Sequence, residues 1–233
     1  MEIRPHLEPF SPVGHGRAES VVRDVLIVDD HPLMCEALSM TLTAAFGLRR
    51  VRSAVSLVAA EASIKSQGAP DAVVLDLNLP DVKGVEGVVS LKALIGEVPL
   101  TVISAEVQHD MVTAVLAAGA RGYIAKSLPR SEMLDAFRRM WSGETVVPES
   151  YEPSDEAVDE AAELMQVFST LTPRQMHILR LICEGRPNKI ISYELSIAEA
   201  TVKTHIAAIM SKVNVRNRTQ AALLASKARL FNR

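Results

Sequence analysis

Five side chains that could take part in phosphoryl chemistry stand at or just after the ends of short runs rich in valine, leucine and isoleucine. They are Asp29, Asp30, Asp76, Ser104 and Lys126. Three carboxylates brought together repel one another unless a cation lies among them, and a small hard cation such as Mg²⁺ prefers oxygen ligands. A carboxylate beside such a cation can accept a phosphoryl group, because the cation and Lys126 neutralise the phosphoryl oxygens while Ser104 donates a hydrogen bond.

Asp76 is the best candidate for the nucleophile. It stands alone after its apolar run, whereas Asp29 and Asp30 are adjacent and better suited to holding a metal ion. Taken singly, any of these residues is better explained as a helix cap or a loop carboxylate. That explanation does not account for the whole set at successive strand ends.

The elements that must position these side chains follow a β–α alternation from residue 24 onward. Amphipathic stretches separate the short runs, which predicts an α/β doubly wound five-stranded parallel sheet with helices on both faces and a reactive edge at the carboxyl ends of the strands. The expected strands are Val25–Val28, Arg50–Arg52, Ala72–Leu75, Leu100–Ile103 and Tyr123–Ala125, and the expected helices begin near Pro32, Ser56, Val85, Val107 and Ser131.

Segments outside this domain differ in composition. Residues 1–21 have no periodicity and are predicted to be disordered. Residues 148–168 carry no lysine or arginine, and seven acids fall between Glu149 and Glu163. This acidic linker could form a helix over Ala157–Phe168 or remain a mobile connector.

The net charge of −3 hides an asymmetry between the two halves. Residues 170–233 carry 11 Lys/Arg against 3 Asp/Glu, whereas residues 1–169 carry 14 against 25. A basic C-terminal module suggests a polyanionic partner, and an acidic N-terminal module argues against the same partner binding there. Charge alone also fits solvated faces that happen to differ.

The basic module, residues 169–233, is predicted to be a small all-α helix-turn-helix domain with helices near 173–184, 188–195, 199–213 and 219–230. In the third helix Val202, Ile206, Ile209 and Val213 recur at helical spacing and should be buried, which turns Lys203, Thr204, Ala207 and Ser211 outward. Because most of these outward side chains are short, this face of the helix can approach a DNA major groove closely. A solvated face on a helical bundle would show the same periodicity.

The sequence also predicts the cellular compartment and the state of the two cysteines. No apolar run approaches the roughly 18 residues needed to cross a bilayer, and no signal peptide is evident, so we expect a cytoplasmic protein that does not bind membranes. Cys35 and Cys183 lie in apolar helical patterns without metal-ligand spacing, and we expect both to be buried thiols.

Four motifs in the first 147 residues resemble the receiver domain of two-component response regulators. They are VLIVDDH at 25–31, VVLDLNLPD at 73–81, ISA at 103–105 and GYIAK at 122–126. The resemblance implies a receiver domain over residues 22–147 whose Asp76 is phosphorylated by a sensor histidine kinase. It implies that Mg²⁺ is bound by Asp30, Asp76 and the backbone carbonyl of Asn78, with Asp29 assisting. Ser104 and Tyr123 would form a switch pair, although Tyr123 also fits ordinary core packing.

The C-terminal motifs resemble the LuxR-type helix-turn-helix, and the whole chain resembles the NarL/FixJ subfamily. They are LTPRQ at 171–175, EG at 184–185, NKII at 188–191, TVKTH at 201–205 and VRNRT at 215–219. The resemblance implies contacts with double-stranded promoter DNA, and a homodimer, at least in the active state, that pairs through residues 219–230. The implied DNA-binding residues are Lys189, Thr201, Lys203, Thr204, Ala207 and Lys212, of which Lys203, Thr204 and Ala207 would face the bases.

Helix starts in this module show one match and two departures. Thr172 and Gln175 form the pattern of a capping box. Pro187 and Ala198 stand where the family commonly has a serine or threonine N-cap, and losing such a cap costs about 1 kcal/mol. Ser196 with Glu199 could supply a substitute capping box for the third helix.

The function that follows is a transcription regulator controlled by phosphorylation, not an enzyme beyond the phosphorylation and dephosphorylation of its own receiver. Phosphorylation could act through dimerisation or by releasing the DNA-binding domain. Two other functions remain open. A receiver-bearing adaptor would bind a protein through the helical module and retain no duplex DNA, and a metal-dependent phosphohydrolase would turn over added phosphate esters.

Overall fold

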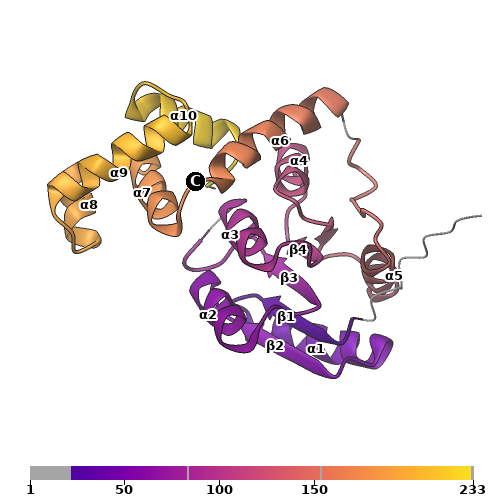
Figure 1. The fold of residues 1–233 in the computed structure, drawn as a ribbon. Coiled ribbons are helices and arrows are strands. Elements are labelled where there is room, and N and C mark those ends of the chain that lie inside the picture. The colour runs from indigo at the N-terminus through magenta and orange to yellow at the C-terminus, as the bar shows by residue number, and fades with distance from the viewer. Residues whose placement is uncertain (1–21, 83, 153, 232–233) are drawn as a thin grey trace, which may run out of the picture.

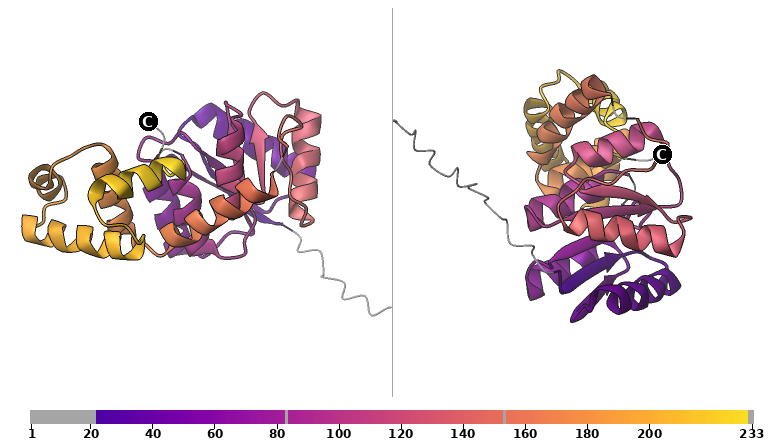
Figure 2. Two further views of the ribbon diagram at one scale, coloured as in Figure 1. Left: turned by 90° about the horizontal axis from the view of Figure 1, so that it is seen from above. Right: turned by 90° about the vertical axis from the view of Figure 1, so that its right-hand side faces the viewer.

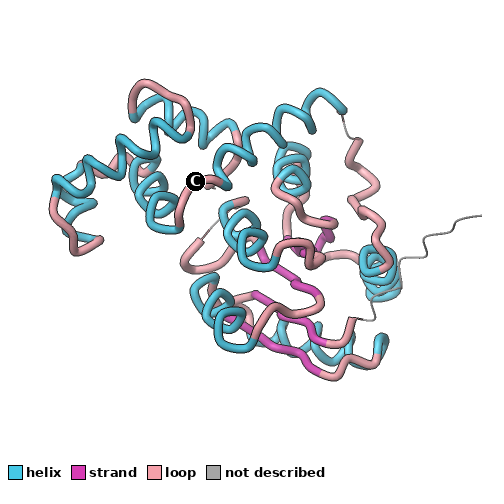
Figure 3. Tube along the Cα trace, in the orientation of Figure 1, coloured by secondary structure: helices cyan, strands magenta, loops and turns pink. Residues whose placement is uncertain are grey.

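The computed structural model describes residues 22–82, 84–152 and 154–231. The predicted disorder of residues 1–21 therefore lies outside the described residues. Three regions follow one another along the chain: an α/β domain, a single long helix and a helical domain. Figure 3 shows the strands gathered in the α/β domain and helices alone in the C-terminal domain. Among the described residues no helix combines the length and apolar character needed to cross a membrane.

The N-terminal domain contains the predicted five-stranded sheet. Its strands lie in the order β2-β1-β3-β4-β5, and every neighbouring pair is parallel. Because the order reverses beside β1, a switch point lies between β1 and β3, where ligands bind in this class of sheet. The bounds are β1 Asp24–Val28, β2 Arg50–Ala54, β3 Ala72–Asp76, β4 Leu100–Ser104 and β5 Gly122–Ala125.

Five helices cover both faces of the sheet. Successive strand residues point to opposite faces, so Val25 and Ile27 pack with α1 and α5, whereas Leu26 and Val28 pack with α2, α3 and α4. These two apolar layers bury β3 and β4 completely and β1 almost so, while the edge strand β2 stays partly exposed. The helices are α1 Pro32–Phe46, α2 Leu57–Gln67, α3 Glu86–Ile95, α4 His109–Ala117 and α5 Arg130–Trp141.

The last residues before the linker extend the sheet. Val146 forms a parallel bridge with Gly122 on β5, and the Tyr123 amide donates to the Val146 carbonyl over 2.9 Å. Further on, the buried Tyr151 hydroxyl lies 3.0 Å from Thr113 Oγ1 on α4. The chain that leads into the linker is therefore tied to β5 through Val146, and the first part of the linker is tied to α4 through Tyr151.

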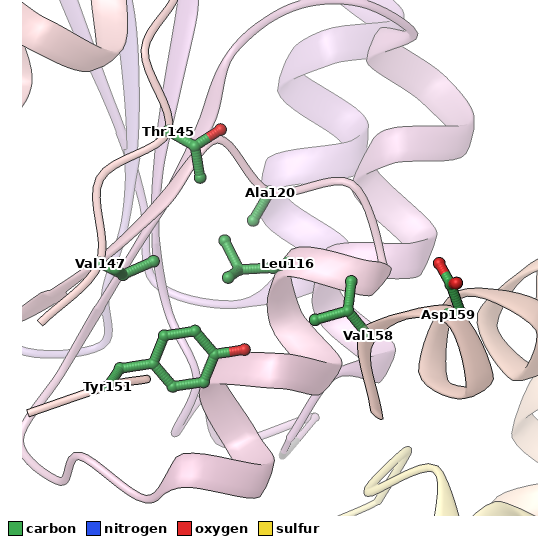
Figure 4. A pocket seen from close by; sticks show the side chains of 7 residues that line it. All are labelled: Leu116, Ala120, Thr145, Val147, Tyr151, Val158 and Asp159. Carbon is green, nitrogen blue, oxygen red and sulfur yellow. The ribbon is translucent and has the colours of Figure 1, made fainter. Parts of the chain in front are cut away.

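A pocket of about 650 Å³ lies between this part of the linker, α4 and the helix that follows. Figure 4 shows Leu116, Tyr151 and Val158 around its interior. Most of its lining is aliphatic or aromatic, and none of the candidate phosphoryl-transfer residues takes part. The chemistry must be sought at the sheet edge instead.

Gly122 is expected to tolerate no side chain, because a Cβ there would lie 2.3 Å from Met140 Sδ and 2.6 Å from the Val146 carbonyl oxygen. The Met140 side chain can move, but the backbone at Val146 must shift. We expect Gly122→Ala to lower the free energy of unfolding by about 1–3 kcal/mol in urea titrations. Gly87→Ala is the control, since its new Cβ would make ordinary contacts at 3.5 Å inside α3 and should not destabilise the protein. Equal stability of both variants would contradict this packing.

The second part of the linker is helical, which decides between the two conformations that its composition allowed. Helix α6 spans Asp155–Ser169 and packs mainly against α4, with fewer contacts to α3. Met165 and Phe168 are buried in the apolar layer that the two domains share. In Figure 1 this helix runs across the top of the α/β domain to the C-terminal domain.

Four helices form the C-terminal domain: α7 Pro173–Cys183, α8 Asn188–Glu194, α9 Glu199–Lys212 and α10 Arg218–Lys227. The capping box of Thr172 and Gln175 is confirmed. The substitute box of Ser196 was wrong, because Ser196 lies in the left-handed region (φ 51°) and Ala198 is the N-cap without a side-chain bond. Cys183 is only half-buried, so the expectation of a buried thiol holds for Cys35 alone.

The C-terminal domain lies beside the α2–α3 side of the α/β domain. The left view of Figure 2 shows the orange and yellow C-terminal domain beside the α/β domain, and hydrogen bonds join the residues after α10 to the start of α3. The recognition-type helix α9 extends on the far side, away from the sheet.

Candidate phosphoryl-transfer site and DNA-binding surface

The predicted convergence at the carboxyl edge of the sheet is present. Asp29 follows β1 directly, Asp76 ends β3, Ser104 ends β4 and Lys126 follows β5. Backbone hydrogen bonds hold the residues at this edge in place. The Asp29 amide donates to the Ala54 carbonyl, and the Lys126 amide donates to the Ser104 carbonyl over 2.7 Å. Parallel strands with this order thus bring two carboxylates, a hydroxyl and an ammonium group to one edge of the sheet.

Lys126 ties the two buried aspartates together. Its Nζ lies 2.9 Å from Asp29 Oδ2 and 2.8 Å from Asp76 Oδ2, and the two carboxylates are 0% and 3% exposed. Burial by itself would lower the pKa of Lys126, but the hydrogen bonds to Asp76 and Asp29 outweigh burial and leave that pKa raised. The ammonium group is therefore charged and partly offsets the repulsion between the carboxylates.

A metal ion fits beside this pair. One ligand atom from each of Asp29, Asp30, His31 and Asp76 lies within 4.8 Å of the others. Asp30 Oδ1 is buried and accepts no hydrogen bond of suitable geometry, although His31 Nδ1 lies 2.8 Å away. A buried carboxylate oxygen without a hydrogen bond is costly unless a cation meets it. The donor set, dominated by carboxylates, suits a hard divalent cation.

Ser104 and Tyr123 lie on the side of the pocket toward α4. Ser104 is 3% exposed, and the Tyr123 ring is 2% exposed with its hydroxyl donating to the Glu106 carbonyl over 2.5 Å. Burial is the main reason why the pKa of Tyr123 is raised, so the hydroxyl keeps its proton and can donate. The Tyr123 side chain is thus held inside the protein, and its hydroxyl is bonded to the loop between β4 and α4.

Helix α9 has the two faces that its spacing predicts. Val202, Ile206, Ile209 and Val213 are buried. The predicted DNA-contacting residues Thr201, Lys203, Thr204 and Ala207 are exposed on the opposite face, and Lys189 is exposed on α8. The outward face is therefore free to enter a groove.

Comparisons with known proteins agree with both sites. Residues 25–138 match the family described as "Response regulator receiver domain", and residues 169–225 match "Bacterial regulatory proteins, luxR family". The "Glycerol metabolism activator" of Pseudomonas putida is 34% identical over 207 residues, covering 86% of this chain and 94% of that protein. The nitrate/nitrite response regulator NarL of Escherichia coli K12 is 33% identical, covering 89% and 96%. The chain belongs to the NarL/LuxR family of response regulators.

Solved structures support the fold of this response regulator. RcsB from Salmonella enterica, bound to promoter rprA, covers 88% of the chain with a TM-score of 0.50 and 20% identity, which speaks for the fold alone. A LuxR family DNA-binding response regulator from Silicibacter pomeroyi is 33% identical with a TM-score of 0.50, covering 56% of this chain and 100% of its own. The receiver and the LuxR-type domain that the motifs indicated are both present.

The response regulator also holds residues that the sequence did not single out for a role. His31 lies 3.1 Å from Asp29 Oδ1 and 2.8 Å from Asp30 Oδ1 through the same ring nitrogen. Its place directly after the aspartate pair was the only available signal. Lys212 is predicted to bind DNA, but in this structure its Nζ donates hydrogen bonds to the Thr170 carbonyl and to Gln175 Oε1. Phosphate contact by Lys212 stays a prediction.

Removing the Lys126 ammonium group from between Asp29 and Asp76 should destabilise the response regulator. We expect Lys126→Met to lower the free energy of unfolding by roughly 3 kcal/mol without Mg²⁺, because it leaves two buried carboxylates uncompensated. Millimolar Mg²⁺ should restore part of the loss by binding the folded state.

The control is Lys65→Met, which removes an exposed pair with Glu61 on α2 and should change stability by less than about 0.5 kcal/mol. Urea titrations of the three proteins, each with and without Mg²⁺, measure both effects. A Lys126→Met protein as stable as the wild type without Mg²⁺ would show that the lysine does not hold this pair together.

Proposed function

We propose that Asp76 accepts a phosphoryl group from a histidine kinase or a small phosphodonor, and that this modification controls promoter binding by α9. The observation that carries the proposal is the buried Asp76 carboxylate, held 2.8 Å from Lys126 beside the Asp29–Asp30 cluster. Phosphoryl transfer needs positive charge around the transferred group and a fixed nucleophile, and this pocket supplies both.

Mg²⁺ would be held by Asp30 and Asp76, with the Asn78 carbonyl and Asp29 assisting. The Asn78 amide donates to Asp76 Oδ1 over 3.2 Å, which fixes the carboxylate toward the pocket. When bound, the ion supplies charge neutralisation for the phosphoryl oxygens. Lys126 orients Asp76, and Ser104 supplies a hydroxyl at the same edge. The chemistry is confined to this aspartate, so the protein acts as a switch and not as an enzyme with external substrates.

DNA binding would use the exposed face of α9, with Lys203, Thr204 and Ala207 toward the bases and Lys189 toward a phosphate. A homodimer would place two such helices on half-sites related by a two-fold axis. The exposure of these side chains and the +8 charge of residues 170–233 support this assignment.

The experiment follows phosphoryl uptake by intact-protein mass after incubation with a small phosphodonor. We expect a single adduct on the wild type with Mg²⁺, its loss in excess chelator, and no adduct on Asp76→Asn. Asp71→Asn is unsuitable as a control because Asp71 caps the start of β1, whereas Asp135→Asn changes an exposed carboxylate on α5. An adduct that persists on Asp76→Asn, or one that forms equally well in chelator, would overturn the proposal.

A further inference from the structure

The backbone of His31 holds its ring beside the acidic cluster, which consists of Asp29, Asp30 and Asp76. His31 is the N-cap residue of α1, but its side chain makes no capping hydrogen bond. Because Pro32 disfavours a helical backbone at the residue before it, His31 is extended, with φ −95° and ψ 103°. The His31 amide donates to Asp29 Oδ1 over 2.8 Å. The imidazole is therefore fixed next to the aspartates without serving as a helix cap.

The imidazole Nδ1 faces two carboxylate oxygens at once. It lies 3.1 Å from Asp29 Oδ1 and 2.8 Å from Asp30 Oδ1. Only the first contact has the geometry of a hydrogen bond, and Asp30 Oδ1 is buried without one. A ring nitrogen of histidine carries a single proton at most, so it cannot satisfy both oxygens. A cation bound by all three atoms satisfies them together.

Lys126 leaves this side of the cluster free. Its Nζ contacts Oδ2 of Asp29 and Oδ2 of Asp76, whereas His31 contacts Oδ1 of Asp29. The ammonium group and the imidazole thus meet different oxygens of the same carboxylate. The lysine therefore does not occupy the oxygen that a cation would share with His31.

The spacing of the donor atoms suits a four-coordinate metal ion. One donor atom from each of four side chains lies within 4.8 Å of the other three, and these side chains are Asp29, Asp30, His31 and Asp76. With bonds of about 2.0 Å, two ligands of a tetrahedral Zn²⁺ ion lie roughly 3.3 Å apart. The two contacts of Nδ1 are close to this value. The His31 side chain is 68% exposed, so an ion can enter from solvent.

A nitrogen donor changes which ion the cluster should prefer. Mg²⁺ binds oxygen ligands and usually keeps several waters, so an imidazole adds little to its affinity. Imidazole is a common ligand of Zn²⁺ and of other divalent transition metals, and the affinity of mixed nitrogen and oxygen sites rises along that series. A carboxylate cluster that includes His31 should therefore discriminate in favour of Zn²⁺.

We propose that His31 is a metal ligand through Nδ1 and that, with the three aspartates, it forms a binding site for Zn²⁺ or a similar transition-metal dication. This inference rests on the proposed function, because the ion takes the position that Mg²⁺ needs during phosphoryl uptake. A Zn²⁺ ion with four protein ligands has no open position for a phosphoryl oxygen. Zn²⁺ therefore inhibits phosphorylation of Asp76, and His31 sets the concentration at which it does so.

A purely structural role for the ring gives a different result. If the imidazole only orients Asp29 through its hydrogen bond, its loss disturbs one carboxylate, and Mg²⁺ and Zn²⁺ are weakened alike. If Nδ1 is a ligand, its loss weakens Zn²⁺ much more than Mg²⁺. The ratio of the two affinities therefore separates the two roles.

The test titrates full-length wild type, His31→Phe and His31→Ala with Zn²⁺ and with Mg²⁺ in a calorimeter at pH 7.5. Phenylalanine keeps a ring without the nitrogen, and alanine shows whether that ring itself disturbs the site. In both variants we expect the affinity for Zn²⁺ to fall at least about ten times more than the affinity for Mg²⁺. Other histidines of the chain can bind Zn²⁺ elsewhere, so only the binding that excess Mg²⁺ weakens is counted.

His109→Phe is the matched control. It removes another exposed imidazole of the receiver and keeps a ring against Tyr151, while it loses only the contact of His109 Nε2 with the Glu152 carbonyl. Its affinities for both ions should equal those of the wild type.

Nuclear magnetic resonance of the histidine side chains names the atom that binds. In long-range ¹H–¹⁵N spectra of the wild type, Zn²⁺ should shift the Nδ1 resonance of His31, and excess Mg²⁺ should reverse the shift. A merely structural ring would not show a metal-bound nitrogen. A resonance of His31 Nδ1 that Zn²⁺ leaves in place overturns the proposal, and so does an equal loss of Zn²⁺ and Mg²⁺ affinity in the two His31 variants.

Phosphoryl uptake with Mg²⁺ and rising Zn²⁺ completes the test. We expect Zn²⁺ to abolish uptake by the wild type, and the concentration for half inhibition to be at least about tenfold higher in His31→Phe. Equal inhibition of both proteins contradicts the role of His31. Uptake with Mg²⁺ that persists while the Zn²⁺ tests fail removes this inference and leaves the proposed function. Absence of uptake by the wild type with Mg²⁺ alone removes the proposed function, whereas the titrations and spectra still decide whether His31 binds the metal.

Discussion

Asp30→Asn is expected to weaken Mg²⁺ binding at least about tenfold and to slow phosphoryl uptake by Asp76 by about two orders of magnitude. Within the acidic cluster, Asp30 Oδ1 is buried without a hydrogen bond, so this oxygen gains from a cation. Asparagine keeps the shape of the side chain but removes its charge. Calorimetric titration with Mg²⁺ and the rate of adduct formation measure the two effects separately.

Asp135→Asn is the matched control, since it removes one negative charge from an exposed position on α5. It should bind Mg²⁺ and take up phosphoryl groups at the wild-type rate. If Asp30→Asn binds Mg²⁺ as tightly as this control does, Asp30 is not a principal ligand and the metal site lies elsewhere in the cluster.

Lys203→Ala is the second change with a large expected effect. Lys203 is exposed on the outward face of α9, with only an exposed ion pair to Glu199 at 3.6 Å to hold it. Loss of a base or phosphate contact costs about 1–3 kcal/mol, which corresponds to roughly 5- to 150-fold weaker binding. Fluorescence anisotropy with a duplex selected from random sequences measures the loss.

The salt dependence of DNA binding shows whether Lys203 contacts a phosphate or a base. If the residue contacts a phosphate, the slope of log affinity against log salt should fall by about one and the loss should be similar for all sequences. If it contacts a base, the loss should be confined to the selected sequence. Lys65→Ala, which removes an exposed lysine on the receiver, should bind as the wild type does. Wild-type affinity in Lys203→Ala would contradict the assignment of this face to DNA.

The receiver pocket could be predicted from the sequence because topology brings it together. Once five parallel strands were expected, Asp29, Asp76 and Lys126 had to meet at one edge, and their ion pairs confirm it. The buried stripe of α9 followed from helical spacing in the same way. Both predictions rest on local periodicity, which the sequence carries directly.

Contacts between the domains could not be predicted in that way. Arg180 and Asp81 are 99 residues apart and lie in units with separate periodicities, so no pattern links them. Glu86 has the sequence setting of an ordinary acidic residue at a helix start, yet it is buried and lies 3.8 Å from Arg180 of the other domain. The error at Ser196 has a similar origin, because spacing showed a possible cap but not the left-handed backbone that turns α8 into α9.

We propose above all that the state of Asp76 controls how the protein binds DNA. The most direct measurement is the affinity of wild type and Asp76→Asn for a selected duplex with two half-sites, each with Mg²⁺, with and without a beryllofluoride phosphoryl mimic. We expect the mimic to tighten DNA binding of the wild type alone. Strong DNA binding by the wild type that is indifferent to the mimic, or an equal response in Asp76→Asn, would contradict it.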